Sequence, residues 1–157
     1  MSTLLPPGDS EWLEPDGLGD FASGTVSGVR TRRYHGLLIP ATKPPAGRTV
    51  PVNGLEAWVE SAGTTFAISA QRYYPNVIYP YAGNRLTSFQ LEPWPTWTFQ
   101  LNEIAIQQEL FAVRGTQSVV LSWKPGQWGN ISVSWRLSVN SSIMLAMIEQ
   151  LTHENTN

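Results

Sequence analysis

The sequence predicts an all-β fold, an antiparallel β-sandwich, and three observations support this prediction. Apolar and polar residues alternate without a break from Ile131 to Val139, which is the pattern of a strand with one buried and one solvated face. Turn-forming residue pairs recur at short intervals along the chain, as they do between the short strands of a sandwich. Pro93 and Pro95 exclude a helix in their segment.

The same two-residue period predicts the other strands. The predicted strands are residues 55–59, 66–70, 97–101, 119–123 and 131–139. The predicted turns between them are Asn53-Gly54, Ala62-Gly63, Arg114-Gly115, Pro125-Gly126 and Gly129-Asn130. Trp123 and Trp135 lie on the apolar faces of their strands and are predicted core residues. Residues 142–150 fit either a helix or a strand.

Composition excludes several functional classes. The 157 residues suffice for one domain, and ten Lys and Arg against twelve Asp and Glu give a net charge of −2. A basic arm that binds nucleic acid is therefore excluded. The absence of cysteine excludes disulfides, a thiolate nucleophile and a Cys-ligated zinc ion. The N-terminus lacks the features of a signal peptide and no apolar run could cross a bilayer, so we expect a soluble, cytoplasmic chain without membrane contact.

Charge is segregated in the first third of the chain. Residues 9–20 hold five acidic residues and no basic one, whereas residues 30–48 hold five basic residues and no acidic one. One interpretation is two surface loops that partly neutralise each other. The other is the polar rim of a cleft, where Arg forks and carboxylates orient hydroxyl groups.

Motifs for catalysis are weak. Gly17-Leu18-Gly19 resembles the start of a dinucleotide-binding loop, but the third glycine is misplaced at Gly24 and no helix pattern follows. His35 and His153 are far apart in the sequence, so a structural role is favoured over a metal site or a triad. We predict no cofactor and no metal.

Paired carboxylates are the remaining catalytic candidates. Glycoside hydrolysis needs two carboxyl groups about 5–10 Å apart. Glu11, Glu14 and Asp16 are close in sequence, and Glu56 and Glu60 share a predicted strand. Nothing in the sequence marks one of these carboxyl groups as buried, so we assign no catalytic residue.

Aromatic residues suggest a binding surface. Trp94 lies between two prolines, where it could offer a flat platform to a sugar ring or pack on the sandwich edge or a neighbouring domain. The Tyr73-Tyr74-Pro75 and Tyr79-Pro80-Tyr81 segments could line a groove or cover a sheet edge.

A longer stretch carries a family resemblance. Residues 11–28, EWLEPDGLGDFASGTVSG, and residues 31–41, TRRYHGLLIPA, resemble the opening of bacterial and archaeal glycogen debranching enzymes, which are amylo-α-1,6-glucosidases. Weaker similarities occur at residues 47–50, 55–56, 89–95 and 151–155. The resemblance therefore touches most of the chain.

The resemblance implies a division of labour. In that family an N-terminal β-sandwich precedes an (α/α)6 barrel, and the barrel carries the acids that hydrolyse the α-1,6-linked glucosyl stub. Here we expect an extension over residues 1–10 and the sandwich over residues 11–157, either complete or without its last strands. No succession of amphipathic helices is present, so none of the family's catalytic residues can be assigned.

Three departures from the family are visible in the sequence. Asp16 stands where the family commonly has Asn, and Asp20 follows Gly19 where the family has Gly. The Arg-Pro-Leu and Arg-Asp-Tyr-His elements that usually precede the final similarity are missing from residues 140–149.

We therefore expect a non-catalytic domain that contributes to α-glucan binding or docks a catalytic barrel in glycogen breakdown. The candidate substrate-binding or interface residues are Glu14, Asp16, Arg32, Arg33, Tyr34, His35 and Trp94. A structural ion pair of Arg33 with Asp16 or Glu14 is an equal alternative for that arginine. The rival hypotheses are a small glycosidase that uses two of its own carboxylates, an interaction module without sugar contact, and a decayed remnant.

Overall fold

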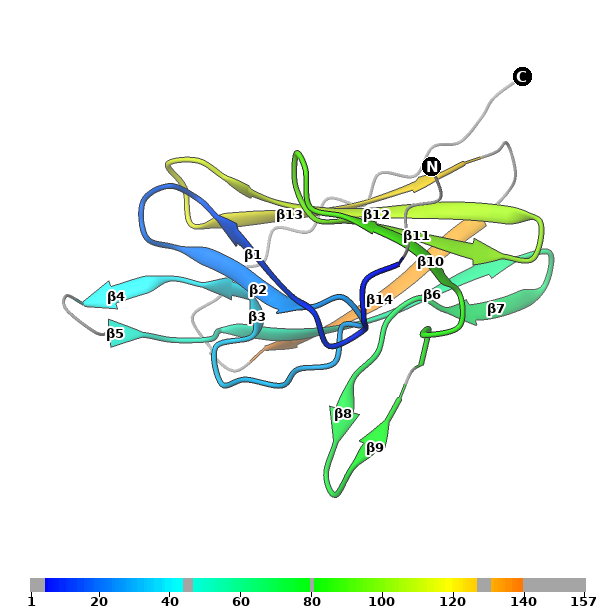
Figure 1. Cartoon of the computed structure of the whole chain (residues 1–157), viewed down its shortest axis with the longest axis horizontal. Helices are drawn as coiled ribbons and strands as arrows, with labels where there is room; N and C mark the ends of the chain where they lie inside the picture. Colours follow the sequence, from blue (N-terminus) through cyan, green and yellow to red (C-terminus); the bar gives the residue numbers. More distant parts are fainter. Residues whose placement is uncertain (1–4, 44–46, 80, 127–130, 140–157) are drawn as a thin grey trace.

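The strands of the protein form two layers. The computed structural model describes residues 5–43, 47–79, 81–126 and 131–139 (Figure 1). Within these residues, one layer is a six-stranded sheet in the order β1-β2-β3-β6-β14, with β7 paired to β6. The other is a four-stranded sheet in the order β10-β11-β12-β13. All pairings are antiparallel, so the predicted sandwich is confirmed.

The first sheet contains β1 (Glu11–Pro15), β2 (Phe21–Thr25), β3 (Gly36–Ile39), β6 (Val52–Ser61), β7 (Thr64–Ala67) and β14 (Ile131–Val139). The second contains β10 (Leu86–Gln90), β11 (Thr96–Leu101), β12 (Ile104–Val113) and β13 (Ser118–Pro125). Two short ribbons project from this body, β4 (Ala41–Lys43) with β5 (Gly47–Arg48) and β8 (Arg72–Tyr73) with β9 (Val77–Ile78) (Figure 1).

The core lies between the two sheets and centres on two tryptophans. The ring of Trp12 on β1 meets that of Trp97 on β11 edge to face, with centroids 5.4 Å apart. Their indole N–H groups donate to the carbonyls of Thr25 and Val26 at the end of β2. Such a pair contributes about 0.5–1.5 kcal/mol beyond its buried area. The pair therefore fastens the two layers at the point where the chain leaves β2.

Strand β6 shows how the alternating pattern is used. Leu55, Ala57 and Val59 are buried in the core, as their period predicts. Asn53-Gly54, however, lies inside β6, so the predicted turn at this pair is wrong. A Cβ at Gly54 would lie 2.6 Å from the amide of Gln71, which donates to the Leu55 carbonyl. Glycine is present here for a close side-chain approach within a strand.

Two other expectations need correction. The strand predicted over residues 66–70 ends at Ala67. Trp123 and Trp135 are partly buried and pack against the core instead of lying inside it. Their strands β13 and β14 are the last in the strand orders of the two sheets, so one side of each lacks a neighbour among the described residues.

The turn predictions at Ala62-Gly63 and Arg114-Gly115 are confirmed, whereas Pro125 ends β13 and the segment that follows Gly126 lies outside the described residues. Ala62 and Gly63 both have positive φ, 51° and 76°, as a tight hairpin turn requires. The turn at Gly129-Asn130, the helix or strand at 142–150, His153, and the family similarity at 151–155 lie outside the described residues.

Candidate functional site

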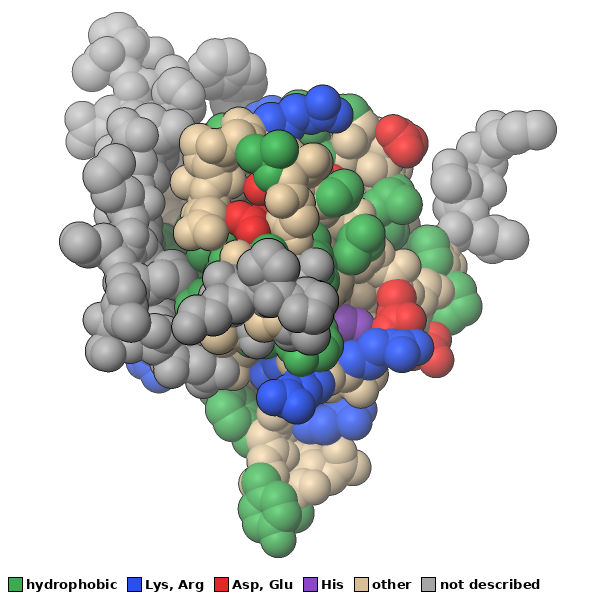
Figure 2. Space-filling model, turned by 90° about the vertical axis from the view of Figure 1, so that its left-hand side faces the viewer, with side chains coloured by type: hydrophobic (Ala, Val, Ile, Leu, Met, Phe, Trp, Pro, Cys, Tyr) green, Lys and Arg blue, Asp and Glu red, His purple; other side chains and the backbone are tan. Residues whose placement is uncertain are grey.

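The loop between β2 and β3 carries most of the predicted site residues. It begins after Thr25, whose buried hydroxyl donates to the Val29 carbonyl, and it turns at Gly28, which has a φ of +88°. It ends at His35, and β3 begins at the next residue, Gly36. Figure 2 shows Lys and Arg side chains gathered on one face of the molecule, above the projecting β8–β9 ribbon.

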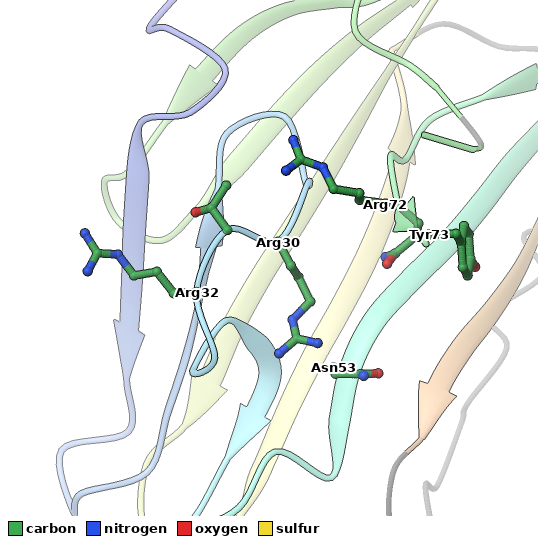
Figure 3. A pocket seen from close by; sticks show the side chains of 7 residues that line it. Arg30, Arg32, Asn53, Arg72 and Tyr73 are labelled. Atoms are coloured by element: carbon green, nitrogen blue, oxygen red, sulfur yellow. The ribbon is translucent and has the colours of Figure 1, made fainter. Parts of the chain in front are cut away.

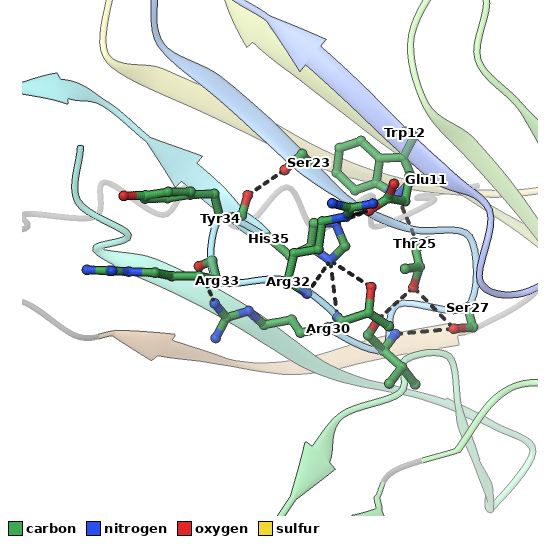
Figure 4. Close-up of polar contacts among 12 residues, drawn as sticks. Glu11, Trp12, Ser23, Thr25, Ser27, Arg30, Arg32, Arg33, Tyr34 and His35 are labelled. Atoms are coloured by element: carbon green, nitrogen blue, oxygen red, sulfur yellow. Dashed lines mark hydrogen bonds and ion pairs between the residues drawn. The ribbon is translucent and has the colours of Figure 1, made fainter. Parts of the chain in front are cut away.

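His35 organises the loop from the inside. Only 3% of this residue is exposed. Its Nδ1 accepts backbone N–H groups of Thr31 at 3.2 Å and of Arg32 at 3.3 Å (Figure 4). Because Nδ1 accepts, the ring proton lies on Nε2, which donates to Oε1 of Glu11 at 3.0 Å. The ring therefore serves as a structural bridge between the loop and β1.

Glu11 is shared by two donors. Its Oε1 also accepts a hydrogen bond from Nε of Arg32. The guanidinium of Arg32, through that hydrogen bond, holds the pKa of the Glu11 carboxyl below its usual value. Glu11 is one of the carboxylates that the sequence offers as catalytic candidates. In the structure its carboxylate pairs with Arg32 and holds that side chain over the loop.

Arg33 and Tyr34 lie on the outside of the same loop. The guanidinium carbon of Arg33 lies 5.5 Å from the centre of the Tyr34 ring. The Tyr34 carbonyl accepts the hydroxyl of Ser23 at 2.6 Å. Within the described residues Arg33 forms no ion pair, so the alternative of a structural pair with Asp16 or Glu14 is wrong. The ion pair forms one residue earlier, between Arg32 and Glu11.

Asp16 has a local structural role. It is buried, and its Oδ1 accepts the backbone N–H groups of Leu18 at 2.6 Å and Asp20 at 3.1 Å. This is the bonding of an Asx-type turn, here between β1 and β2. Asp20 is buried too, and accepts the N–H of Ala41 at 2.8 Å. Neither carboxylate faces the loop that holds Arg33.

Glu14 lies on the same side of β1 as the core residue Trp12, since residues i and i+2 of a strand share a face, and it lies close to the second sheet. Burial raises the pKa of its carboxyl; a hydrogen bond from the Ala112 backbone opposes this rise, and the charge of Glu92 adds to it. Glu92 itself is exposed. The Glu14 carboxyl is therefore mildly desolvated and lies apart from the His35 loop.

Trp94 packs on the sandwich. Its ring lies 4.9 Å from that of Phe111 on β12 at an angle of 38°, and its side chain is only partly exposed. This is the edge-packing interpretation given by the sequence. Trp94 is therefore not a free-standing platform, and the structure does not bring it together with the loop residues.

A hollow lies beside the loop between β2 and β3. It has a volume of about 430 Å³ (Figure 3). We call it the arginine hollow, and its walls are Arg30, Thr31, Arg32, Asn53, Gln71, Arg72 and Tyr73. Three of the seven carry a positive charge and none carries a negative one. Arg32 is the one predicted site residue in its wall.

Arg30 is the most unusual member of the hollow. Burial lowers the pKa of its guanidinium. Its Nη2 donates to the carbonyl of Arg33 at 3.0 Å, whereas its buried Nε has no hydrogen-bond partner. No carboxylate among the described residues pairs with it. Charges that are taken out of water are usually paired, and this half-buried guanidinium has no carboxylate partner among the described residues.

One wall of the hollow is fixed by a polar cluster. The Tyr73 hydroxyl donates to Oε1 of Glu56, a buried carboxylate on β6. Arg136 on β14 lies 3.8 Å from the other oxygen of Glu56. The hydrogen bond to Glu56 raises the pKa of the Tyr73 phenol. These contacts fasten the base of the β8–β9 ribbon to the sheet.

The Glu56–Glu60 pair considered in the sequence is too widely spaced for a hydrolytic site. Glu56 and Glu60 are four residues apart on β6, which corresponds to ~13 Å along a strand. That exceeds the spacing used for glycoside hydrolysis. No three His, Asp or Glu side chains of the described residues cluster closely enough to hold a metal ion.

The loop, the hollow and the sandwich lie in one recognisable family domain. The family described as "Glycogen debranching enzyme N terminal" matches residues 10–157. The chain belongs to this family. No curated protein matches it, and no solved structure does.

Membership of the glycogen debranching enzyme N-terminal family confirms the resemblance on which the sequence interpretation relied. It does not assign a role to any of the seven predicted site residues. Four of them, residues 32–35, form one cluster, whereas Glu14, Asp16 and Trp94 lie elsewhere. Among the described residues, no helix is both long and apolar enough to span a membrane.

Sequence reasoning missed most of the arginine hollow. Asn53 was assigned to a turn, Arg72 was not singled out, and Gln71 carried no signal. Tyr73 was recognised only as part of an aromatic segment. The one usable signal was the excess of Arg over Lys, eight against two, which favours forked contacts but does not place them.

Proposed function

We propose that this chain is a non-catalytic domain of a glycogen debranching enzyme in glycogen breakdown, and that it docks the catalytic (α/α)6 barrel. The observation that supports docking is the tyrosine hairpin, which we define as residues 72–79. It projects from the sandwich and exposes large apolar side chains to solvent (Figures 1 and 2).

The hairpin has the composition of an interface core. Tyr74 is 97% exposed, Tyr79 61% and Val77 52%. No charged residue occurs between Tyr73 and Tyr79. Interface cores are enriched in Tyr and depleted of charge, and contiguous exposed apolar patches mark interaction sites.

The base of the hairpin is held firmly. The Tyr73 hydroxyl bonds Glu56, and the N–H of Tyr79 donates to the carbonyl of Gln71 at 2.8 Å. A two-stranded ribbon on its own is marginally stable. With its base fixed, the hairpin presents its apolar tip in a constant position, which lowers the entropic cost of docking.

Docking is tested by mixing the chain with the separately produced barrel of a debranching enzyme from this family. We expect a complex in size-exclusion chromatography and calorimetry, and a loss of affinity of about tenfold or more in a Val77→Asp, Ile78→Asp double variant. Leu18→Asp is the matched control, because Leu18 is 73% exposed on a different turn. Equal binding by the double variant and the wild type would refute docking through the hairpin.

A second candidate function is α-glucan binding by the same hairpin. Tyr74 and Tyr79 expose their rings, and sugar rings stack their C–H faces on such aromatic surfaces. The exposed aliphatic side chains of Val77 and Ile78 favour a protein partner over a sugar. Calorimetric titration with malto-oligosaccharides distinguishes the two, since binding that is lost in Tyr74→Ala and kept in Val77→Asp would favour the glucan.

A further inference from the structure

The arginine hollow is separate from the exposed tip of the tyrosine hairpin and has a different chemistry. A volume of about 430 Å³ falls in the range of small-molecule sites. Its walls offer guanidinium, amide and phenol groups, whereas the hairpin tip offers apolar surface. The docking proposal leaves this hollow without a role.

The charges of the hollow are unbalanced. Arg32 is neutralised by Glu11. Arg30 and Arg72 form no ion pair with a described carboxylate, and the nearby Glu56 is already bonded by Tyr73 and flanked by Arg136. The arginine hollow therefore carries two positive charges without counter-charges on the described protein.

The orientation of the side chains follows from Figure 3. The guanidinium of Arg30 points toward Asn53 on β6, and Arg72 extends from β8 toward the loop that carries Arg30. The Arg32 side chain points the opposite way from that of Arg30, toward Glu11. Arg30 and Arg72 are thus the two cations left to the hollow.

Two polar atoms in the wall are unsatisfied. Nε of Arg30 and Oδ1 of Asn53 are both buried and lack a hydrogen-bond partner. A buried polar atom without a partner is destabilising. Arg30 therefore retains an unused donor beside the hollow.

Several other polar groups of the wall already have hydrogen-bond partners. The Gln71 amide donates to the Leu55 carbonyl, and the Tyr73 hydroxyl donates to Glu56. The backbone N–H of Thr31 donates to Nδ1 of His35. Apart from the Asn53 amide, the charged donors of the hollow are the guanidinium groups of Arg30 and Arg72, which match the oxygens of phosphate and carboxylate groups in forked geometry.

We propose that the arginine hollow binds a small oxyanion, through the guanidinium groups of Arg30 and Arg72. The oxyanion is a phosphate ester or a carboxylate, since both present the coplanar oxygens that an arginine fork recognises. This site does not depend on the docking of a barrel.

The test is calorimetric titration of the full chain with three probes: inorganic phosphate, glycerol 3-phosphate and succinate. Glucose serves as the neutral control. We expect saturable binding of at least one anion, weakened by added salt because the contact is ionic. Stronger binding of the phosphates assigns the site to phosphate esters, and stronger binding of succinate assigns it to carboxylates.

Variants make the test specific. Arg30→Gln should weaken anion binding about tenfold or more, since each charge-assisted contact contributes roughly 1.5–3 kcal/mol. Arg33→Gln, which removes the same charge from the outside of the same loop, should change binding less than about twofold. If Arg30→Gln fails to fold, Arg72→Gln at an exposed position replaces it. Absence of saturable binding by every anion, or equal losses in Arg30→Gln and Arg33→Gln, would overturn the proposal.

Discussion

The buried ring of His35 donates to the carboxylate of Glu11 across 3.0 Å, and this bond joins the loop after β2 to the first strand. On its other side the ring accepts two backbone N–H groups. The His35 side chain thus joins the backbone N–H groups of Thr31 and Arg32 to Glu11, which lies at least twenty positions earlier in the sequence. The loop that forms one wall of the arginine hollow depends on it.

The first prediction concerns this ring. His35→Ala leaves the N–H groups of Thr31 and Arg32 without an acceptor and should lower the free energy of unfolding by about 2–4 kcal/mol. Arg33→Ala, exposed on the same loop, should change it by less than about 0.5 kcal/mol. Urea denaturation measures both. Similar small losses in the two variants would contradict the role given to His35.

Asp16 provides a second prediction. Asp16→Ala removes the acceptor for two turn N–H groups and should cost about 1–3 kcal/mol. Asp16→Asn keeps an oxygen in the same place and should be nearly neutral, which fits the sequence resemblance, in which Asn is common at this position. Thermal melts of the two variants separate loss of the acceptor from loss of the charge. A large loss in Asp16→Asn would show that the charge, not the turn, matters.

Glu14 gives a prediction for pH dependence. Burial raises the pKa of the Glu14 carboxyl in the folded chain. Above that raised pKa, the ionised carboxylate therefore destabilises the folded state relative to the unfolded state. Below the unfolded value of 4.5, both states are protonated and the penalty is gone. Glu14→Gln should therefore stabilise the chain at pH 7 and have no effect at low pH. Melting curves over this pH range check the sign; destabilisation at pH 7 would contradict it.

Tyr73 tests the anchoring of the hairpin. Tyr73→Phe removes the hydroxyl that donates to buried Glu56, so the base of the hairpin should open more often. Amide exchange at residues 77–79 should become faster, whereas Tyr74→Phe, at a fully exposed ring, should leave it unchanged. Unchanged exchange in Tyr73→Phe would show that Glu56 does not hold the hairpin.

The strands could be predicted because alternation reports which face is buried. Two strands behave as their period requires: Leu55, Ala57 and Val59 are buried, and Ile131, Val133 and Trp135 face the core. The turn prediction at Gly54 was wrong because glycine occurs both in turns and where another group approaches the backbone closely. The two cannot be separated until Gln71 is seen to pack against it. Residue propensity reflects local backbone geometry, whereas Gly54 is required by its contact with Gln71, seventeen positions later in the sequence.

The candidate site was only partly predictable for a related reason. Residues 32–35 are contiguous, so their clustering was visible in the sequence. The arginine hollow joins Arg30 to Asn53 and Arg72 across three segments, and no local pattern encodes such a meeting. The partner of Arg32 was missed because the two ends of that ion pair lie twenty-one residues apart.

The most direct test of the central claim is the release of glucose from a branched limit dextrin. The chain alone should release none, and adding it to the separate catalytic barrel should raise the rate of the barrel, with the increase lost in the Val77→Asp, Ile78→Asp variant. Glucose release by the chain alone, abolished in Glu14→Gln, would contradict the claim that this sandwich serves a catalytic partner.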